Sequence, residues 1–269
     1  MSSFGQICAE NLEKVRARKP LIHNITNFVV MNSTANVLLA AGASPVMAHA
    51  ANEVEEMAGF AGALVLNIGT LTDIWVESML LAGRKCTELK TPIVLDPVGS
   101  GATALRTITA KRIIEETSVS VIRGNASEIL SLRNTDSKTK GVDSLHSVDE
   151  AAEAAKALAI ELGTTLAITG PVDLVTDGQR VLRVANGHPL MSYVTGTGCA
   201  ATSVIGAFAA VDDDTVTATA TALAYYGLAG EKAGAMSNGP GSFMVNLLDA
   251  LYNLTPEDVK AGSKISADA

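Results

Sequence analysis

Between residues 63 and 171, short runs of apolar residues alternate with longer segments of helical periodicity, and this alternation limits the possible folds most strongly. The short runs are rich in Val, Ile and Leu and too brief for helices, which is typical of buried strands. Alternating strands and helices are typical of a parallel sheet covered by helices. Strands are predicted over residues 63–69, 92–99, 119–125 and 164–171, and helices over 72–90, 104–118 and 147–163.

The rest of the chain adds helices and one hairpin to this pattern. Residues 5–18 have apolar positions at helical spacing. In residues 172–186, alternating residues flank Asp177-Gly178, a strong hairpin signal. Further helices are predicted over 199–211, 214–235 and 241–253, and the helix over 214–235 has small residues all round, so we expect it to be buried. We expect one α/β domain over residues 1–269, with a mostly parallel central sheet covered by helices on both faces.

Composition argues against several classes of protein. The net charge is −8 without a run of Lys or Arg, so a nucleic-acid partner is not expected. No apolar stretch approaches the roughly 18 residues of a membrane span, and the N-terminus lacks a signal-peptide core. Cys8, Cys86 and Cys199 lie far apart, which predicts free thiols and a cytoplasmic location. Charged residues make up only 18%, which favours extensive buried surface, including surface between subunits.

Polar residues follow the predicted strands at their C-terminal ends, where ligands bind in open parallel sheets. Asp96 could fix a loop or lie near a metal, and Glu128 could complement a helix N-terminus or hold a water on Mg²⁺. Together the two carboxylates favour the metal. Arg123 could pair with a carboxylate or clamp a phosphate, which suits its planar fork. Thr169 is either an ordinary strand residue or a phosphate donor.

A turn rich in Thr and Gly, Thr195–Gly198, leads directly into an apolar helix. The free N–H groups of such a first turn would stabilise an anion. The turn matches neither a P-loop nor a dinucleotide-binding fingerprint. Cys199 lies where turn and helix meet, and a helix N-terminus is expected to lower the pKa of a thiol. The thiol could then serve as base, weak donor or nucleophile, or it could simply pack under the turn.

Two long segments, 20–52 and 184–211, contain no charged residue. They include Asn24 and Met47 in the first and the Thr/Gly turn in the second. Such segments could line a pocket for a small, neutral, partly apolar molecule. They could also form a subunit interface, and both roles are compatible.

Six motifs occur in collinear order between about residue 20 and residue 251. They are HNITNFVVMNSTANVLLAAGASPVMAHA (23–50), VLDPVGSGAT (94–103), VIRGNASEI (121–129), AITGPVDLVTDG (167–178), NGHPLMSYVTGTGCAATSVIGAF (186–208) and NGPGSFMVNLLDAL (238–251). Together they resemble the hydroxyethylthiazole kinases of thiamine salvage, in the ribokinase-like superfamily. The resemblance implies phosphorylation of 4-methyl-5-(2-hydroxyethyl)thiazole by ATP with Mg²⁺, and a homotrimer with active sites at subunit interfaces.

The same resemblance implies roles for individual residues. Many kinases of the superfamily carry an aspartate base in a Gly-x-Gly-Asp pattern, whereas this chain and the resembled family carry Cys199 there. A weak base can suffice, because phosphoryl transfer depends mainly on positioning and charge stabilisation. Thiazole contacts are implied for Asn24, Met47, Thr195 and Gly196, ATP contacts for Arg123 and Thr169, an anion hole for Thr197, Gly198 and Cys199, and Mg²⁺ contacts, largely through water, for Asp96 and Glu128.

Three other functions fit parts of the sequence. One is a ribokinase-like kinase for another vitamin precursor, such as a pyridoxine-type or pyrimidine alcohol, although the absent Gly-x-Gly-Asp argues against it. Another is a hydrolase with Cys199 as nucleophile, which needs a histidine base. The third is a metabolite-binding protein without catalysis. The histidines are His23, His49, His146 and His188, and none lies in a recognisable nucleophile motif.

Overall fold

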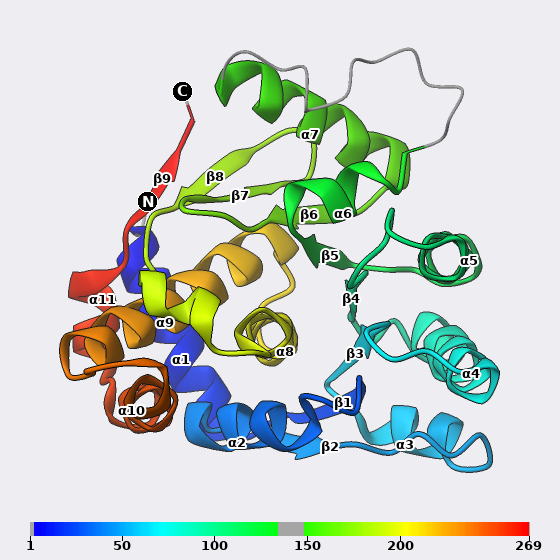
Figure 1. Cartoon of the computed structure of the whole chain (residues 1–269), viewed down its shortest axis with the longest axis horizontal. Helices are drawn as coiled ribbons and strands as arrows, with labels where there is room; N and C mark the ends of the chain where they lie inside the picture. Colours follow the sequence, from blue (N-terminus) through cyan, green and yellow to red (C-terminus); the bar gives the residue numbers. More distant parts are fainter. Residues whose placement is uncertain (1–2, 134–147, 269) are drawn as a thin grey trace.

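The computed structural model describes residues 3–133 and 148–268. In these ranges the centre of the molecule is a sheet with the strand order β2-β1-β3-β4-β5-β6-β7-β8-β9 (Figure 1). Strands β1 to β6 pair in parallel, and β7, β8 and β9 extend one edge antiparallel. The strands are β1 (Leu21–Ile25), β2 (Ser44–Val46), β3 (Ala63–Asn67), β4 (Ile93–Asp96), β5 (Val121–Gly124), β6 (Thr165–Ile168), β7 (Asp173–Thr176), β8 (Val181–Val184) and β9 (Ile265–Ala267).

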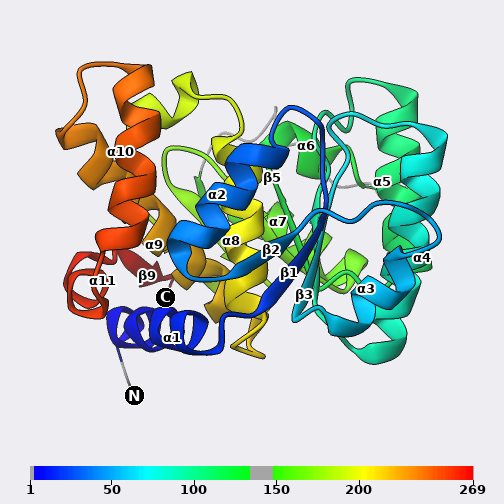
Figure 2. The same ribbon diagram turned by 90° about the horizontal axis from the view of Figure 1, so that it is seen from below.

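Helices cover both faces of this sheet, as the two views in Figures 1 and 2 show. One face carries α1 (Phe4–Arg18), α2 (Met31–Ala41), α8 (Thr197–Ala209), α9 (Thr215–Ala235), α10 (Pro240–Asn253) and α11 (Pro256–Gly262). The other carries α3 (Val54–Phe60), α4 (Asp73–Leu89), α5 (Ala104–Glu116), α6 (Ala126–Leu130) and α7 (Val148–Leu162). A short 3₁₀ helix, η2 (Pro189–Tyr193), precedes α8. The predicted α/β fold is confirmed.

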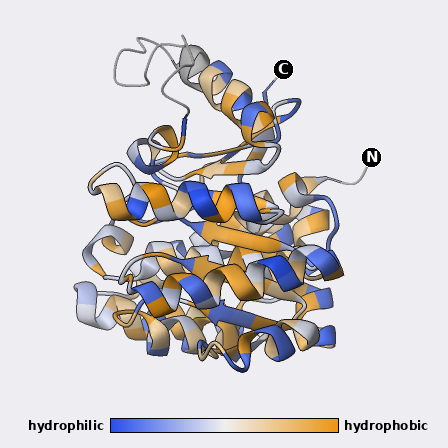
Figure 3. Ribbon diagram, turned by 90° about the vertical axis from the view of Figure 1, so that its right-hand side faces the viewer, coloured by the Kyte–Doolittle hydropathy of each residue, from blue (hydrophilic) through white to orange (hydrophobic). Residues whose placement is uncertain are grey.

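The strands are apolar because both of their faces are buried. In β3, Val65 packs into the core beneath α8 and α9, whereas Leu64 and Leu66 pack into the core beneath α4 and α5. In β4, Val94 faces the first core and Leu95 the second. Figure 3 shows this apolar character along the central strands. Burial of both faces therefore explains why the sequences of these strands are continuously apolar rather than alternating between apolar and polar residues.

The predicted elements that the structure describes are confirmed to within a few residues, including the buried helix α9. The start of the helix predicted at residue 147, and His146, lie outside the described residues. Four elements before residue 61, namely β1, β2, α2 and α3, were not predicted, nor were α11 and β9 near the C-terminus. Within the described ranges, no helix is both long and apolar enough to cross a membrane.

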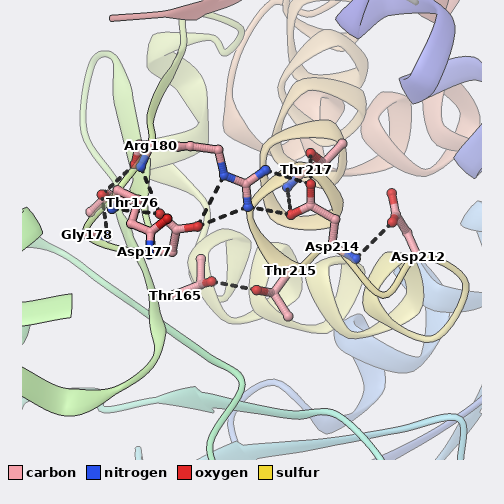
Figure 4. Close-up of polar contacts among 10 residues, drawn as sticks. Thr165, Thr176, Asp177, Gly178, Arg180, Asp212, Asp214, Thr215 and Thr217 are labelled. Carbon is pink, nitrogen blue, oxygen red and sulfur yellow. Dashed lines mark hydrogen bonds and ion pairs between the residues drawn. The ribbon is translucent and has the colours of Figure 1, made fainter. Parts of the chain in front are cut away.

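The predicted hairpin β7–β8 is tied to the start of α9 through Arg180 (Figure 4). Its guanidinium donates to both carboxylate oxygens of Asp214 at 2.7 and 2.8 Å and also to Asp177 in the turn. Asp214 in turn caps α9 by accepting from the Thr217 N–H. Hydrogen bonds from Arg180 lower the pKa of Asp214 to about 2. The hairpin and α9, which both border the cavity described below, are therefore held at a fixed spacing.

Close packing of α1 on α11 makes Gly5 a test of the fold. A Cβ at Gly5 would overlap the carbonyl oxygen of Lys260, whereas a Cβ at Gly59 in α3 would meet no heavy atom within 4 Å. Gly5→Ala should lower the free energy of unfolding by about 2 kcal/mol, because two helix backbones must separate. Gly59→Ala should raise it by about 0.5–1 kcal/mol through helix propensity. Urea unfolding measures both, and a Gly5→Ala variant as stable as wild type would contradict this packing.

Candidate active site

The candidate site lies where four neighbouring strands end. Strands β3, β4, β5 and β6 are adjacent and parallel, so their C-terminal ends meet at one edge of the sheet. Asn67 and Asp96 are direct register partners at the ends of β3 and β4. Arg123 lies near the end of β5, and Thr169 directly follows β6. The fold therefore brings together polar residues from segments about a hundred positions apart.

Asp96 is completely buried at the centre of this edge. Its Oδ2 accepts hydrogen bonds from Asn67 Nδ2 and Thr202 Oγ1, each at 2.9 Å, and lies 3.7 Å from Arg123 Nη1. Burial raises the pKa of Asp96, while the charge of Arg123 opposes that rise. Its Oδ1 has no partner among the described residues. One carboxylate oxygen is therefore left to accept from a water or a ligand.

Arg123 connects the strand ends to the start of α8. Its Nη2 donates to Thr169 Oγ1 at 2.7 Å, and a Cβ on Gly198 would lie only 2.7 Å from its Nη1. The guanidinium therefore lies beside the N-terminus of α8, which carries a partial positive charge. Two positive groups in contact are unfavourable unless an anion lies between them or close by. The geometry fits a phosphate site.

The first turn of α8 is open to such an anion. Gly196 is the N-cap residue, with a φ of +86°, and has no side chain to accept from the first N–H groups. Helix geometry leaves those N–H groups without intrahelical partners. The hydroxyl of Thr197 donates back to the carbonyl of Met191 at 2.7 Å, so Thr197 can offer its backbone N–H rather than its side chain. Thr195 is exposed one residue before the cap.

The structure corrects the expected titration of Cys199. Burial, with the charge of Asp96, raises the pKa of this thiol to about 11, although Asn67, Arg123 and Asn27 oppose the shift. Asn27 Nδ2 contacts the sulfur at 3.6 Å. The expectation that the helix N-terminus lowers this pKa is wrong, because the thiol is largely enclosed and faces a carboxylate. Cys199 is therefore a thiol near neutral pH, not a thiolate.

Glu128 holds two loops together. Its Oε1 accepts from the Gly99 N–H at 2.8 Å, and its Oε2 accepts from the Asn125 N–H at 2.9 Å. Among the described residues, no group of three or more His, Cys, Asp or Glu forms a metal cluster. The free Oδ1 of Asp96, with the charge of Glu128 close enough to raise the Asp96 pKa, nevertheless fits Mg²⁺. This ion commonly keeps several waters and relies on substrate phosphates and one or two carboxylates.

Two of the residues expected to contact a small substrate, Asn24 and Met47, lie at β1 and β2, whereas Thr195 and Gly196 lie at the start of α8. Asn24 is buried, with its Nδ2 donating to Ile22 O and its Oδ1 accepting from Ser203 Oγ of α8 at 2.9 Å. Met47 follows β2, and its neighbour Ala48 is held by a 2.8 Å contact between its carbonyl and His23 Nε2. In the described part of the chain, no hydrogen bond or ion pair joins Met47 to the group around Arg123.

A cavity of about 600 Å³ opens beside Arg123 and runs toward η2 and α9. Its wall includes Thr169, which follows β6, and Thr197 and Gly198 in the first turn of α8. Sequence reasoning missed three further lining residues. Asp173 starts the hairpin, His188 caps η2, and Tyr226 lies in the middle of α9. Of these three residues, only His188 could have been found from the sequence, because it falls in the second charge-free segment.

The sequence profile of the Hydroxyethylthiazole kinase family matches residues 12–257. The chain belongs to the hydroxyethylthiazole kinase family. A Desulfotalea psychrophila protein named hydroxyethylthiazole kinase is 68% identical over 98% of this chain and 97% of its own. A solved hydroxyethylthiazole kinase structure from Pyrococcus horikoshii OT3 has 46% identity and a TM-score of 0.90, covering 98% of this chain and 99% of that one. A Staphylococcus aureus pyridoxal kinase, at 17% identity and a TM-score of 0.63 over 93% and 98%, shares the fold.

In this member of the hydroxyethylthiazole kinase family, Asp173 should make stability depend on pH. Burial raises its pKa from 3.8 to about 6, although it accepts from the Gly170 N–H. The folded state then binds more protons than the unfolded state between these values, so stability falls as pH rises through that window. Asp173→Asn keeps the acceptor and removes the charge. It should be about 1–3 kcal/mol more stable than wild type at pH 7.5 and equal to it below about pH 4.

Urea unfolding at both pH values tests this expectation. A constant difference between Asp173→Asn and wild type across the window would show that the carboxyl is not desolvated in the folded protein.

Proposed function

We propose that the strand-end site transfers the γ-phosphoryl group of ATP to the primary alcohol of 4-methyl-5-(2-hydroxyethyl)thiazole, a reaction of thiamine biosynthesis. One observation carries the proposal: the Arg123 guanidinium lies directly against the uncapped first turn of α8. Buried Asp96, 3.7 Å from Arg123, offsets part of this positive charge. A transferring phosphoryl group at the same place would be stabilised by the guanidinium and the helix N-terminus together. Membership of the family supports the choice of substrate.

In the proposed mechanism, the residues position and stabilise charge rather than react covalently. ATP phosphates occupy the cavity next to Arg123 and Thr169, and the N–H groups of Thr197, Gly198 and Cys199 form the anion hole. The thiazole hydroxyl attacks the γ-phosphorus in line from the side of Cys199. The bond from the γ-phosphorus to the bridging oxygen breaks, ADP leaves, and the hydroxyl proton is lost to water late in the transfer. Such transition states are loose, so positioning and electrostatic stabilisation supply most of the rate. The 2.7 Å hydrogen bond from Arg123 to Thr169 supports this mechanism, because it fixes the guanidinium at the strand ends.

Asp96 and Glu128 would hold Mg²⁺, largely through water. When bound, the ion would supply positive charge that offsets the charge of the ATP phosphates. The free Oδ1 of Asp96 supports this role most directly. Glu128 already accepts hydrogen bonds from two backbone N–H groups. It would therefore contribute to Mg²⁺ binding by orienting waters through its remaining lone pairs.

The thiazole would lie against Asn24, Met47, Thr195 and Gly196. We propose one kinase domain over residues 1–269 that works in the cytoplasm as a homotrimer, with active sites at subunit interfaces. Large apolar side chains exposed beside the site support a subunit contact there. Phe28 and Val29, which follow β1, are 58% and 65% exposed, and Tyr193, just before the Thr/Gly turn, is 72% exposed.

Cys199 is expected to contribute little as a base, because a thiol with a pKa of about 11 is almost fully protonated near pH 7.5. Cys199→Ala should therefore keep kcat within about tenfold of wild type, which is below the roughly 10²–10⁴-fold contribution of general acid–base catalysts. Cys199→Asp supplies a carboxylate and should raise kcat severalfold. Steady-state kinetics at saturating ATP and thiazole measures both. A fall of a thousandfold in Cys199→Ala would restore the thiol to a central catalytic role.

A substrate panel tests the proposed activity. Coupled ADP release is measured with Mg²⁺-ATP and, in turn, the thiazole alcohol, a pyridoxine-type alcohol and a pyrimidine alcohol. We expect kcat/KM for the thiazole to exceed the others by at least about a hundredfold. A preference for another alcohol would reassign the substrate within kinases. Nucleotide binding without ADP release for any alcohol would instead favour a non-catalytic binding protein.

A further inference from the structure

Two adjacent tyrosines in the middle of α9 differ in one respect. Tyr225 and Tyr226 are both almost completely buried. The Tyr225 hydroxyl donates to the carbonyl of Leu251 in α10. The Tyr226 hydroxyl has no hydrogen-bond partner among the described residues. A buried hydroxyl without a partner is unfavourable and uncommon, so its place in the structure calls for a ligand or a water.

The surroundings of Tyr226 indicate which kind of ligand. Tyr226 lines the same cavity of about 600 Å³ as Arg123, Thr197 and Gly198. The Nε of Arg123 is likewise buried without a partner. Burial raises the pKa of Tyr226, and the nearby charge of Arg123 opposes that rise. The hydroxyl therefore keeps its proton near neutral pH and acts as a donor within electrostatic reach of a guanidinium.

We propose that the Tyr226 hydroxyl donates a hydrogen bond to a phosphate oxygen of the nucleotide, on the side of the cavity occupied by Arg123. The inference rests on the proposed function, in which this cavity holds ATP. A phosphate group carries several anionic oxygens that accept hydrogen bonds, so a single phosphate can serve as acceptor for Tyr226 and for the Arg123 Nε. An apolar part of a ligand would leave both donors unpaired.

Two single-atom deletions test this assignment. Tyr226→Phe removes a hydroxyl that has no protein partner, so the thermal midpoint without nucleotide should stay the same or rise. Its affinity for ADP, measured by calorimetry, should fall about tenfold. Its affinity for adenosine, which has no phosphate, should not change. Tyr225→Phe is the matched control and loses the bond to Leu251, so its midpoint should fall by several degrees while ADP binding stays at the wild-type level.

Each outcome has one meaning. Unchanged ADP affinity in Tyr226→Phe would overturn the inference. The hydroxyl would then donate its hydrogen bond to a buried water. An equal loss for ADP and adenosine overturns the phosphate assignment, because the acceptor would then be on the nucleoside. Absence of ADP binding in the wild-type protein overturns the proposed function and the inference with it.

Discussion

Replacing Arg123 by alanine should lower kcat/KM for phosphoryl transfer by about 10³-fold, the scale of a lost arginine at a transferring phosphoryl group. The reason is geometric. Arg123 is the side chain that connects Thr169, Asp96 and the first turn of α8. No other residue of the described cavity wall carries a guanidinium or an ammonium group. Coupled ADP release at varied ATP and thiazole concentrations measures the loss.

The stability of this variant must be measured in parallel. Removing Arg123 leaves buried Asp96 without its opposite charge, a change that is strongly destabilising when the carboxylate cannot take up a proton. Arg123→Lys is the matched control, because it keeps the charge and loses the planar fork. It should keep the wild-type thermal midpoint and still lose most of the activity. Near-wild-type turnover in both variants would show that Arg123 has no role in phosphoryl transfer.

Gly198→Ala should reduce kcat by about 10²-fold without unfolding the protein. The added Cβ would lie 2.7 Å from Nη1 and 2.9 Å from Nη2 of Arg123. These atoms end a flexible side chain, so the guanidinium moves while the fold remains. Gly198 is also in the first turn of α8, where its N–H faces the proposed anion hole. The substitution therefore displaces the phosphate clamp without removing any functional group.

Gly241→Ala provides the control for this second variant. Gly241 is also in the first turn of a helix, α10, and a Cβ there would meet no heavy atom within 4 Å. It should leave turnover unchanged and keep or slightly raise the thermal midpoint through helix propensity. A Gly198→Ala enzyme as fast as Gly241→Ala would mean that the position of the Arg123 fork does not limit the reaction.

Much of the fold could be predicted because its central strands are buried on both faces. The run Leu64–Leu66 is apolar at every position, and its strand is confirmed. The edge strand β2 and its neighbour β1 gave no such signal. His23 and Asn24 interrupt the apolar pattern of β1. Their polar side chains make tertiary hydrogen bonds, His23 Nε2 with Ala48 O and Asn24 Oδ1 with Ser203. Strand β9 depends on pairing with β8, which is distant in the sequence.

The residues of the candidate site could be predicted from the sequence where their position at the end of a strand identifies them. Asp96 and Arg123 could be selected because they end parallel strands, and the structure brings them within 3.7 Å of each other. The raised pKa of Cys199 could not be predicted, because it comes from burial and from the charge of Asp96, which is distant in the sequence. No feature of the sequence indicated that Tyr226 belongs to the site. Its hydroxyl becomes informative only when its surroundings, and the lack of a partner there, are known.

The most direct test of the account is transfer of label from γ-³²P-ATP in a single turnover. Protein in excess is mixed with Mg²⁺, labelled ATP and the thiazole alcohol, and labelled thiazole phosphate is counted over time for wild type and Arg123→Ala. We expect label to reach the thiazole in the wild type and almost none in Arg123→Ala on the same time scale. Release of label only as inorganic phosphate, or equally fast transfer by Arg123→Ala, would contradict the account.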